Sequence, residues 1–144
     1  KTGQITITDE RMTRFWITQK GAAHFIIECM NMMRGGEVFV PKIPSMSVYE
    51  VAQTIAPSVN KHATGIRAGE KLHEALISSD ESRNTLELHG MYIIQPTHQE
   101  WSVSPDEYTN VVPMASNGLF SDTNTSWLTP EGLLWRINDA EISD

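Results

Sequence analysis

The chain has a single cysteine, Cys29, and this scarcity excludes two classes of site. One cysteine cannot form a disulfide within the chain, and it cannot build a cysteine-based metal cluster. Cys29 lies in an apolar run with Phe25 and Met30, which favours a small buried hydrophobic residue. Low cysteine use also fits a reducing compartment.

Long apolar runs and clustered positive charge are missing as well. No segment approaches the about 20 apolar residues that a membrane-spanning helix needs, and the N-terminus has no apolar signal core. The 11 basic residues are scattered among 18 acidic ones, and the net charge is −7. Binding nucleic-acid phosphates needs a clustered excess of Lys and Arg, so we expect neither nucleic acid nor membrane as a partner.

Several catalytic signatures are absent from the sequence. There is no Gly-x-Gly-x-x-Gly dinucleotide fingerprint and no Gly-x-Ser-x-Gly elbow. No tyrosine has a lysine four residues after it, and the five histidines show no metal-ligand spacing. We therefore expect no catalytic residue, no metal and no cofactor-binding residue in this chain by itself.

What is present predicts a mixed α/β fold. A chain of 144 residues suffices for one domain with a core. Alternating apolar residues predict strands, and apolar stripes with caps predict helices. We expect strands at 5–8, 37–40, 61–66, 86–88 and 91–95, a polar loop at 9–16, and helices at 18–34, 47–56, 72–77 and from 129.

Composition divides the chain into a core and an arm. Residues 1–96 carry most of the expected elements, whereas 97–144 begin with a stretch rich in Ser, Thr, Asn, Asp and Pro. We expect 1–96 to be the domain core and 97–144 to be an irregular arm with a closing helix. Three tryptophans are expected to anchor that arm and helix: Trp101, Trp127 and Trp135.

The pair Arg67 and Glu70 is the strongest candidate for ligand binding. Gly69 lies between them and lets a ligand approach the backbone closely. A guanidinium matches phosphate oxygens, and a carboxylate accepts hydrogen bonds from vicinal ribose hydroxyls. A plain surface turn with a salt bridge has the same pattern, so both readings stay open at this point.

Arg14 is a second candidate, since it stands beside the aromatic pair Phe15 and Trp16. Apolar neighbours strengthen the hold of an arginine on an anion. The competing interpretation is a structural arginine paired with Asp9 or Glu10.

Several motifs in order resemble one family. They lie at residues 6–9, 12–17, 35–46, 65–74 and 92–96. Together they resemble the inverting UDP-N-acetylglucosamine 4,6-dehydratases and related polysaccharide biosynthesis proteins, which are extended short-chain dehydrogenases. The resemblance implies the small substrate-binding domain of such an enzyme, without its Rossmann half.

The resemblance also implies a function for the pair of candidate residues. It implies a cytoplasmic enzyme that binds NADP in the Rossmann half and converts a UDP-sugar to a 4-keto-6-deoxy sugar. Arg67 would hold the diphosphate and Glu70 the ribose, with Arg14 and Met12 lining the same ligand. No NADP would bind to this chain alone, which is expected to be inactive without the missing Rossmann half.

The sequence departs from the family pattern in the loop that carries the two candidate residues. The family usually has proline where Ala68 stands, which implies a less rigid loop here.

The alternative function is a non-catalytic interaction or nucleotide-sugar-binding module derived from the family. In either case, apolar surface that lacks the Rossmann half is expected to cause self-association, so the partner would be that half or a second copy.

Overall fold

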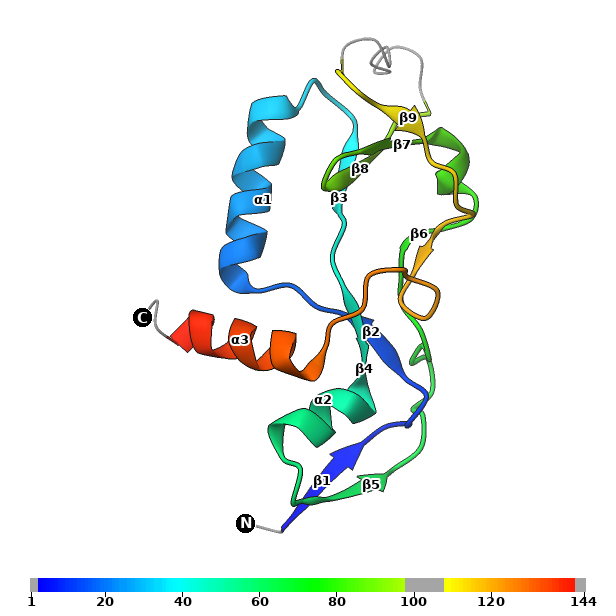
Figure 1. Cartoon of the computed structure of the whole chain (residues 1–144). Coiled ribbons are helices and arrows are strands. Elements are labelled where there is room, and N and C mark those ends of the chain that lie inside the picture. The colour runs from blue at the N-terminus through cyan, green and yellow to red at the C-terminus, as the bar shows by residue number, and fades with distance from the viewer. Residues whose placement is uncertain (1–2, 98–107, 142–144) are drawn as a thin grey trace. The chain divides into compact units, whose positions relative to one another are not determined.

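The computed structural model describes residues 3–97 and 108–141 and confirms the mixed α/β class (Figure 1). Contacts between Cα atoms divide the chain into two compact units. Unit 1 comprises residues 1–19, 43–74 and 121–144, and unit 2 comprises 20–42 and 75–120. These boundaries do not coincide with the expected division at residue 96, which stays a prediction.

Unit 1 contains two small sheets and two helices. Strand β1 (Gln4–Ile7) lies parallel to β5 (Asn60–Ala63), and β2 (Thr13–Phe15) lies antiparallel to β4 (Ser45–Ser47). The polar loop expected at 9–16 was therefore wrong for its last part, because Thr13–Phe15 pairs with β4. Helix α2 (Val48–Ile55) follows β4, and helix α3 (Pro130–Glu141) ends the unit.

Local sequence signals explain both helices of unit 1. The Ser47 Oγ accepts hydrogen bonds from the Tyr49 and Glu50 backbone N–H groups at 3.2 and 3.4 Å, as expected of an N-cap. The Thr129 Oγ1 accepts a bond from the Gly132 N–H at 3.1 Å, and Pro130 occupies the first position of α3. The core of the unit consists of Met46, Val51, Leu128 and Leu133, with Trp16 and Ile137 packed against it.

Unit 2 is a four-stranded antiparallel sheet with one long helix. The sheet order is β3 (Val38–Pro41), β8 (Met91–Ile94), β7 (Thr85–Leu88) and β9 (Val112–Pro113). A second pair joins β6 (Ala75–Ile77) to β10 (Leu119–Phe120), and a 3₁₀ helix spans Glu81–Asn84. The helix expected at 72–77 was wrong, since Ala75–Ile77 pairs as a strand.

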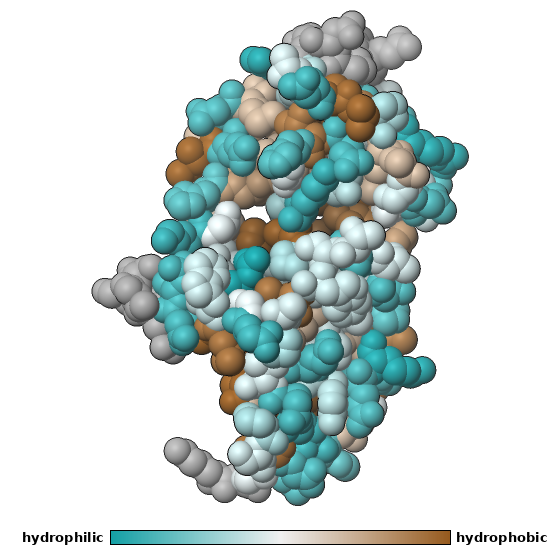
Figure 2. Space-filling view, in the orientation of Figure 1, coloured by the Kyte–Doolittle hydropathy of each residue, from teal (hydrophilic) through white to brown (hydrophobic). Residues whose placement is uncertain are grey.

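Helix α1 (Gln19–Met32) confirms the expected helix, but its apolar stripe is not a core. None of its residues is buried, and Met30 is 66% exposed. Cys29 is half-buried, so its expected burial was only partly right. On the side of unit 2 that carries α1, Figure 2 shows a small brown area among mostly teal residues.

The expected role of Trp127 and Trp135 as buried anchors was wrong. Trp127 is 45% exposed and Trp135 is 66% exposed. Trp101 lies outside the described residues. The buried anchors of the closing helix are aliphatic instead, chiefly Leu133.

Candidate nucleotide-binding turn

Residues 67–70 form a tight turn in unit 1, which confirms the expected loop. The Glu70 N–H donates to the Arg67 carbonyl oxygen at 3.0 Å. The Glu70 carboxylate in turn accepts from the Arg67 N–H at 3.3 Å. Gly69 has a φ of +83°, a conformation that residues with a side chain rarely adopt. Glycine at this position therefore allows the chain to reverse between the two candidate residues.

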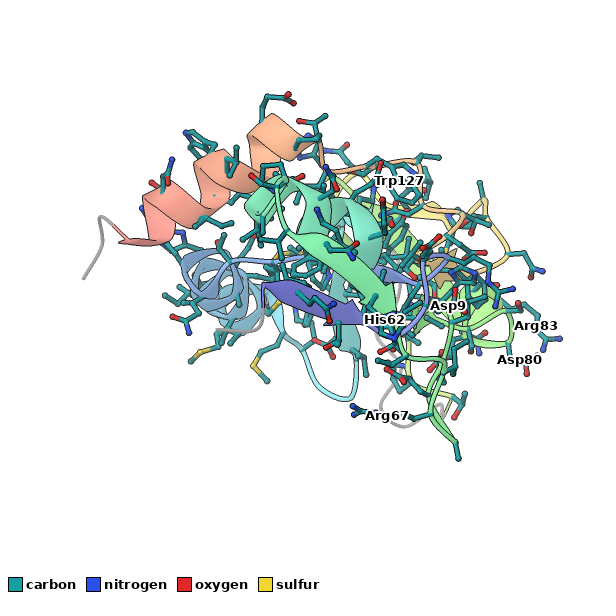
Figure 3. The ribbon with its side chains drawn as sticks, turned by 90° about the horizontal axis from the view of Figure 1, so that it is seen from below. Asp9, His62, Arg67, Asp80, Arg83 and Trp127 are labelled. Atoms are coloured by element: carbon teal, nitrogen blue, oxygen red, sulfur yellow. The ribbon has the colours of Figure 1, made fainter. Side chains whose placement is uncertain are left out.

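The side chain of Arg67 projects from this turn (Figure 3). Residues 62–69 are all exposed, and Glu70 is half-buried. In the part of the chain that the structure describes, Arg67 forms no ion pair, with Glu70 or with any other carboxylate. The salt-bridged surface turn is therefore not observed, and the guanidinium donors are available to an anion.

The chain is held firmly on the N-terminal side of the turn. Strand β5 pairs with β1 along its whole length. The pairing continues beyond the strands, because the Thr64 N–H donates to the Ile7 carbonyl at 2.9 Å and the Gly65 N–H donates to the Thr8 carbonyl at 3.0 Å. The exposed turn therefore starts from a fixed point.

Arg14 holds the chain on the other side. Its Nη2 donates to the Lys71 carbonyl at 3.0 Å, and its Nη1 donates to the carbonyls of Leu72 and Thr13 at 3.1 and 2.7 Å. Its Nε lies 3.5 Å from the Glu74 Oε1. The expected structural pairing of Arg14 with Asp9 or Glu10 was wrong, because Arg14 binds the segment that leaves the turn.

Asp9 is paired with Arg11 instead. Arg11 donates to Asp9 from its backbone N–H and from its guanidinium, at 2.9 to 3.0 Å. The side-chain hydrogen bond from Arg11 is the main reason why the pKa of Asp9 falls to about 2. Asp9 therefore stays ionised, and its charge is already matched.

Met12 occupies a different environment from the other three candidates. Only 3% of its surface is exposed, and its carbonyl accepts from the Val48 N–H at 2.9 Å. Its side chain therefore belongs to the interior of unit 1. The roles of Met12 and Arg14 as ligand contacts stay predictions.

Three further polar residues, Thr13, His73 and Ser121, are hydrogen-bonded to one another next to the segment that leaves the turn, and this network was not predicted from the sequence. The Thr13 Oγ1 is 2.8 Å from the His73 Nδ1 and 2.7 Å from the Ser121 Oγ. Thr13 and Ser121 are separated by 108 residues and belong to no common motif. The only sequence signal was the adjacency of Thr13 to Arg14 and of His73 to the turn.

Comparisons with known proteins show that the chain is similar to proteins of polysaccharide biosynthesis. Residues 1–96 match a family model described as polysaccharide biosynthesis protein. The chain is 39% identical to the UDP-N-acetylglucosamine 4,6-dehydratase (inverting) of Campylobacter jejuni serotype O:2, over 96% of this chain and 43% of that protein. The resemblance inferred from the sequence motifs is confirmed.

Two further relatives have different names. The UDP-glucose 4-epimerase of Rickettsia akari is 34% identical over 63% of this chain and 28% of its own length. The X-ray structure of Pen from Bacillus thuringiensis superposes with a TM-score of 0.80 at 28% identity, covering 99% of this chain and 43% of that one. The chain thus spans less than half the length of each of these relatives.

No helix in the described ranges is both long enough and apolar enough to cross a bilayer.

Proposed function

The chain belongs to the polysaccharide biosynthesis protein family, and on that premise we propose that its 67–70 turn holds the UDP portion of a nucleotide-sugar. Arg67 binds the diphosphate, and Glu70 accepts hydrogen bonds from the ribose hydroxyls. The observation that carries this proposal is an exposed, unpaired arginine beside a carboxylate, on a turn that is anchored at both ends. The relatives named for UDP-sugar chemistry support it.

The reaction to which this binding contributes is the 4,6-dehydration of UDP-N-acetylglucosamine. In this proposal these 144 residues supply the substrate-binding portion, and the catalytic tyrosine and lysine and the NADP site lie in a Rossmann half outside them. The support is the alignment with 43% of an inverting dehydratase along 96% of this chain. Its location in the cytoplasm stays a prediction.

Calorimetric titration with UDP tests the role of Arg67. Loss of a hydrogen bond to a charged group costs about 1.5–3 kcal/mol, so Arg67→Ala should weaken UDP binding roughly tenfold to 150-fold. Arg83→Ala is a matched control, since Arg83 is an exposed arginine of unit 2 paired with Asp80. Equal UDP affinities for Arg67→Ala, Arg83→Ala and the unaltered chain would exclude the site.

A second titration tests whether Glu70 accepts a hydrogen bond from the ribose 2′-hydroxyl. Glu70→Gln should weaken binding of UDP more than it weakens binding of 2′-deoxy-UDP, because the deoxynucleotide has one hydroxyl fewer to lose. A variant that weakens both ligands equally would place Glu70 away from the 2′-hydroxyl. Retention of full UDP affinity in Glu70→Gln would remove Glu70 from the site.

The apolar face of α1 favours the alternative function, an interaction module. Exposed residues of this face are Ile26, Ile27 and Met30, and Met33, just after the end of the helix, is exposed as well. Sedimentation analysis should show self-association that Met30→Glu reduces and Asn31→Glu, on an exposed polar position of the same helix, leaves unchanged. Strong association without any UDP binding would favour the interaction module over substrate binding.

A further inference from the structure

We infer that Thr13 and Ser121 are positioning residues for the 67–70 turn, acting through the segment 71–74. The inference rests on the proposed function only for its ligand, because the position of the turn can be measured without one. All the groups involved lie within unit 1.

Segment 71–74 is hydrogen-bonded along its length to Thr13, Arg14 and Ser121. The Thr13 N–H donates to the Leu72 carbonyl at 3.2 Å. The Ser121 N–H donates to the Glu74 carbonyl at 2.8 Å, and the Glu74 N–H donates to the Ser121 Oγ at 2.9 Å. Together with the bonds from Arg14, these contacts fix the direction in which the chain leaves the turn.

Burial makes this arrangement rigid. Ser121 is fully buried, and Thr13 is 6% exposed. A buried hydroxyl without a partner carries a desolvation cost, so a satisfied buried network strongly favours one geometry. The Ser121 Oγ also donates to the Thr13 carbonyl at 3.2 Å, which ties the two residues together twice.

Neither hydroxyl is placed to contact a ligand. Both are enclosed, whereas the turn itself is exposed. Their effect on binding therefore passes through the backbone of 71–74. This segment holds one end of the exposed turn and so positions Arg67 and Glu70.

Matched substitutions separate positioning from general stability. Thr13→Val and Ser121→Ala remove the two hydroxyls. Thr85→Val and Ser82→Ala are controls in unit 2, where both residues are equally buried and donate to nearby carbonyls at 2.7 and 2.8 Å. Thr13→Ser keeps the hydroxyl and serves as the conservative variant.

The first readout is the NMR amide signals of Gly69 and Glu70 without ligand. Thr13→Val and Ser121→Ala should shift or broaden these signals, whereas Thr13→Ser and both controls leave them in place. Unchanged signals in folded Thr13→Val and Ser121→Ala would overturn the inference. Equal changes in the controls would also overturn it, since the effect would then be general.

The second readout is UDP affinity. The net contribution of one hydrogen bond predicts a weakening of about threefold to tenfold for Thr13→Val and Ser121→Ala, and none for the controls. An unaltered chain that binds no UDP would refute the proposed function, and the NMR readout alone would then decide the positioning. Moved amide signals with unchanged UDP affinity would overturn the positioning role in binding.

Discussion

The two units bury their polar side chains in different ways. In unit 1, Thr13 bonds Ser121 across 108 residues, and Asn124 bonds Ser45 across 79. In unit 2, Ser82 and Thr85 bond carbonyls only three and four residues earlier. Unit 1 uses its buried hydrogen bonds to fix distant segments against one another, whereas unit 2 uses them to finish a local turn.

The apolar side chains do not separate the units in this way, because each unit has both a buried core and exposed apolar residues. Unit 1 buries Met46 and exposes Ile55 and Trp135, and unit 2 buries Ile77 and Ile93 and exposes Ile26, Ile27 and Met30 of α1. The difference between the units therefore lies in their buried hydrogen bonds, which are long-range in unit 1 and local in unit 2.

The largest expected effect on the free energy of unfolding distinguishes a buried methionine of unit 1 from an exposed methionine of unit 2. Met46→Ala should lower the free energy of unfolding by about 2–5 kcal/mol, because it leaves a cavity in a closed core. Met30→Ala should change it by less than about 0.5 kcal/mol, since the side chain is mostly solvated. Urea unfolding at low protein concentration measures both. A comparable loss in Met30→Ala would show that the α1 face is covered.

The buried amide of Asn124 gives the next largest effect. Its Nδ2 donates to the Ile43 carbonyl at 2.9 Å and to the Ser45 Oγ at 3.0 Å. Asn124→Ala leaves these acceptors without their partner and should cost about 1–3 kcal/mol. Thermal unfolding of Asn124→Ala beside Ser82→Ala compares a long-range network with a local one. A smaller loss for Asn124→Ala would reverse the contrast between the units.

The carboxylate of Glu37 gives unit 2 a dependence on pH. Partial burial acts to raise its pKa, but hydrogen bonds from backbone N–H groups, including those of Arg34 and Gly35, and from the Tyr108 hydroxyl outweigh burial and lower the pKa. A lowered folded pKa means that the ionised form stabilises the fold above the ordinary carboxyl value of about 4.3 and that this stability is lost as pH falls through the folded value.

Glu37→Gln removes this titration. The difference in unfolding free energy between the unaltered chain and Glu37→Gln should be constant near neutral pH and should shrink below about pH 4. Denaturant unfolding across pH 3–7 measures it. A difference that stays the same throughout this range would mean that the carboxylate is not held in its charged form.

The smallest expected effect is spectroscopic and concerns His73. One assignment satisfies every contact in the network: Ser121 donates to the Thr13 carbonyl, Thr13 donates to the Ser121 Oγ, and the His73 Nδ1–H donates to the Thr13 Oγ1. ¹⁵N NMR should therefore find a proton on Nδ1 of neutral His73. A neutral ring protonated only on Nε2 would reverse the direction of this chain of hydrogen bonds.

Much of the fold followed from local sequence. The Ser47 cap, the Thr129-Pro130 helix start and the strands on either side of His89 and Gly90 were all predicted, because each depends on residues a few positions apart. Strands β2 and β6 were missed, since each is a short segment that pairs with a partner distant in the sequence.

The candidate site divides in the same way. The turn and the exposure of Arg67 follow from a glycine flanked by charged residues, so sequence alone located them. The partners of Arg14 are backbone carbonyls, which leave no signature in residue identity. The half-burial of Cys29 also differs from the full burial expected of it, because an apolar stripe predicts that a helix packs and does not say against what.

The exposed turn at 65–69 has a consequence for how this protein can change. A Cβ atom added at Gly65 or Gly69 would meet no atom within 4 Å, so nothing packs against the chain at these two positions. If the turn binds a ligand as proposed, replacements at Ile66, Arg67 or Ala68 would alter that binding and leave the folding of unit 1 almost unchanged. The proposed binding role and the stability of the fold would then depend on different residues, and this short turn would be the place to engineer a new binding preference.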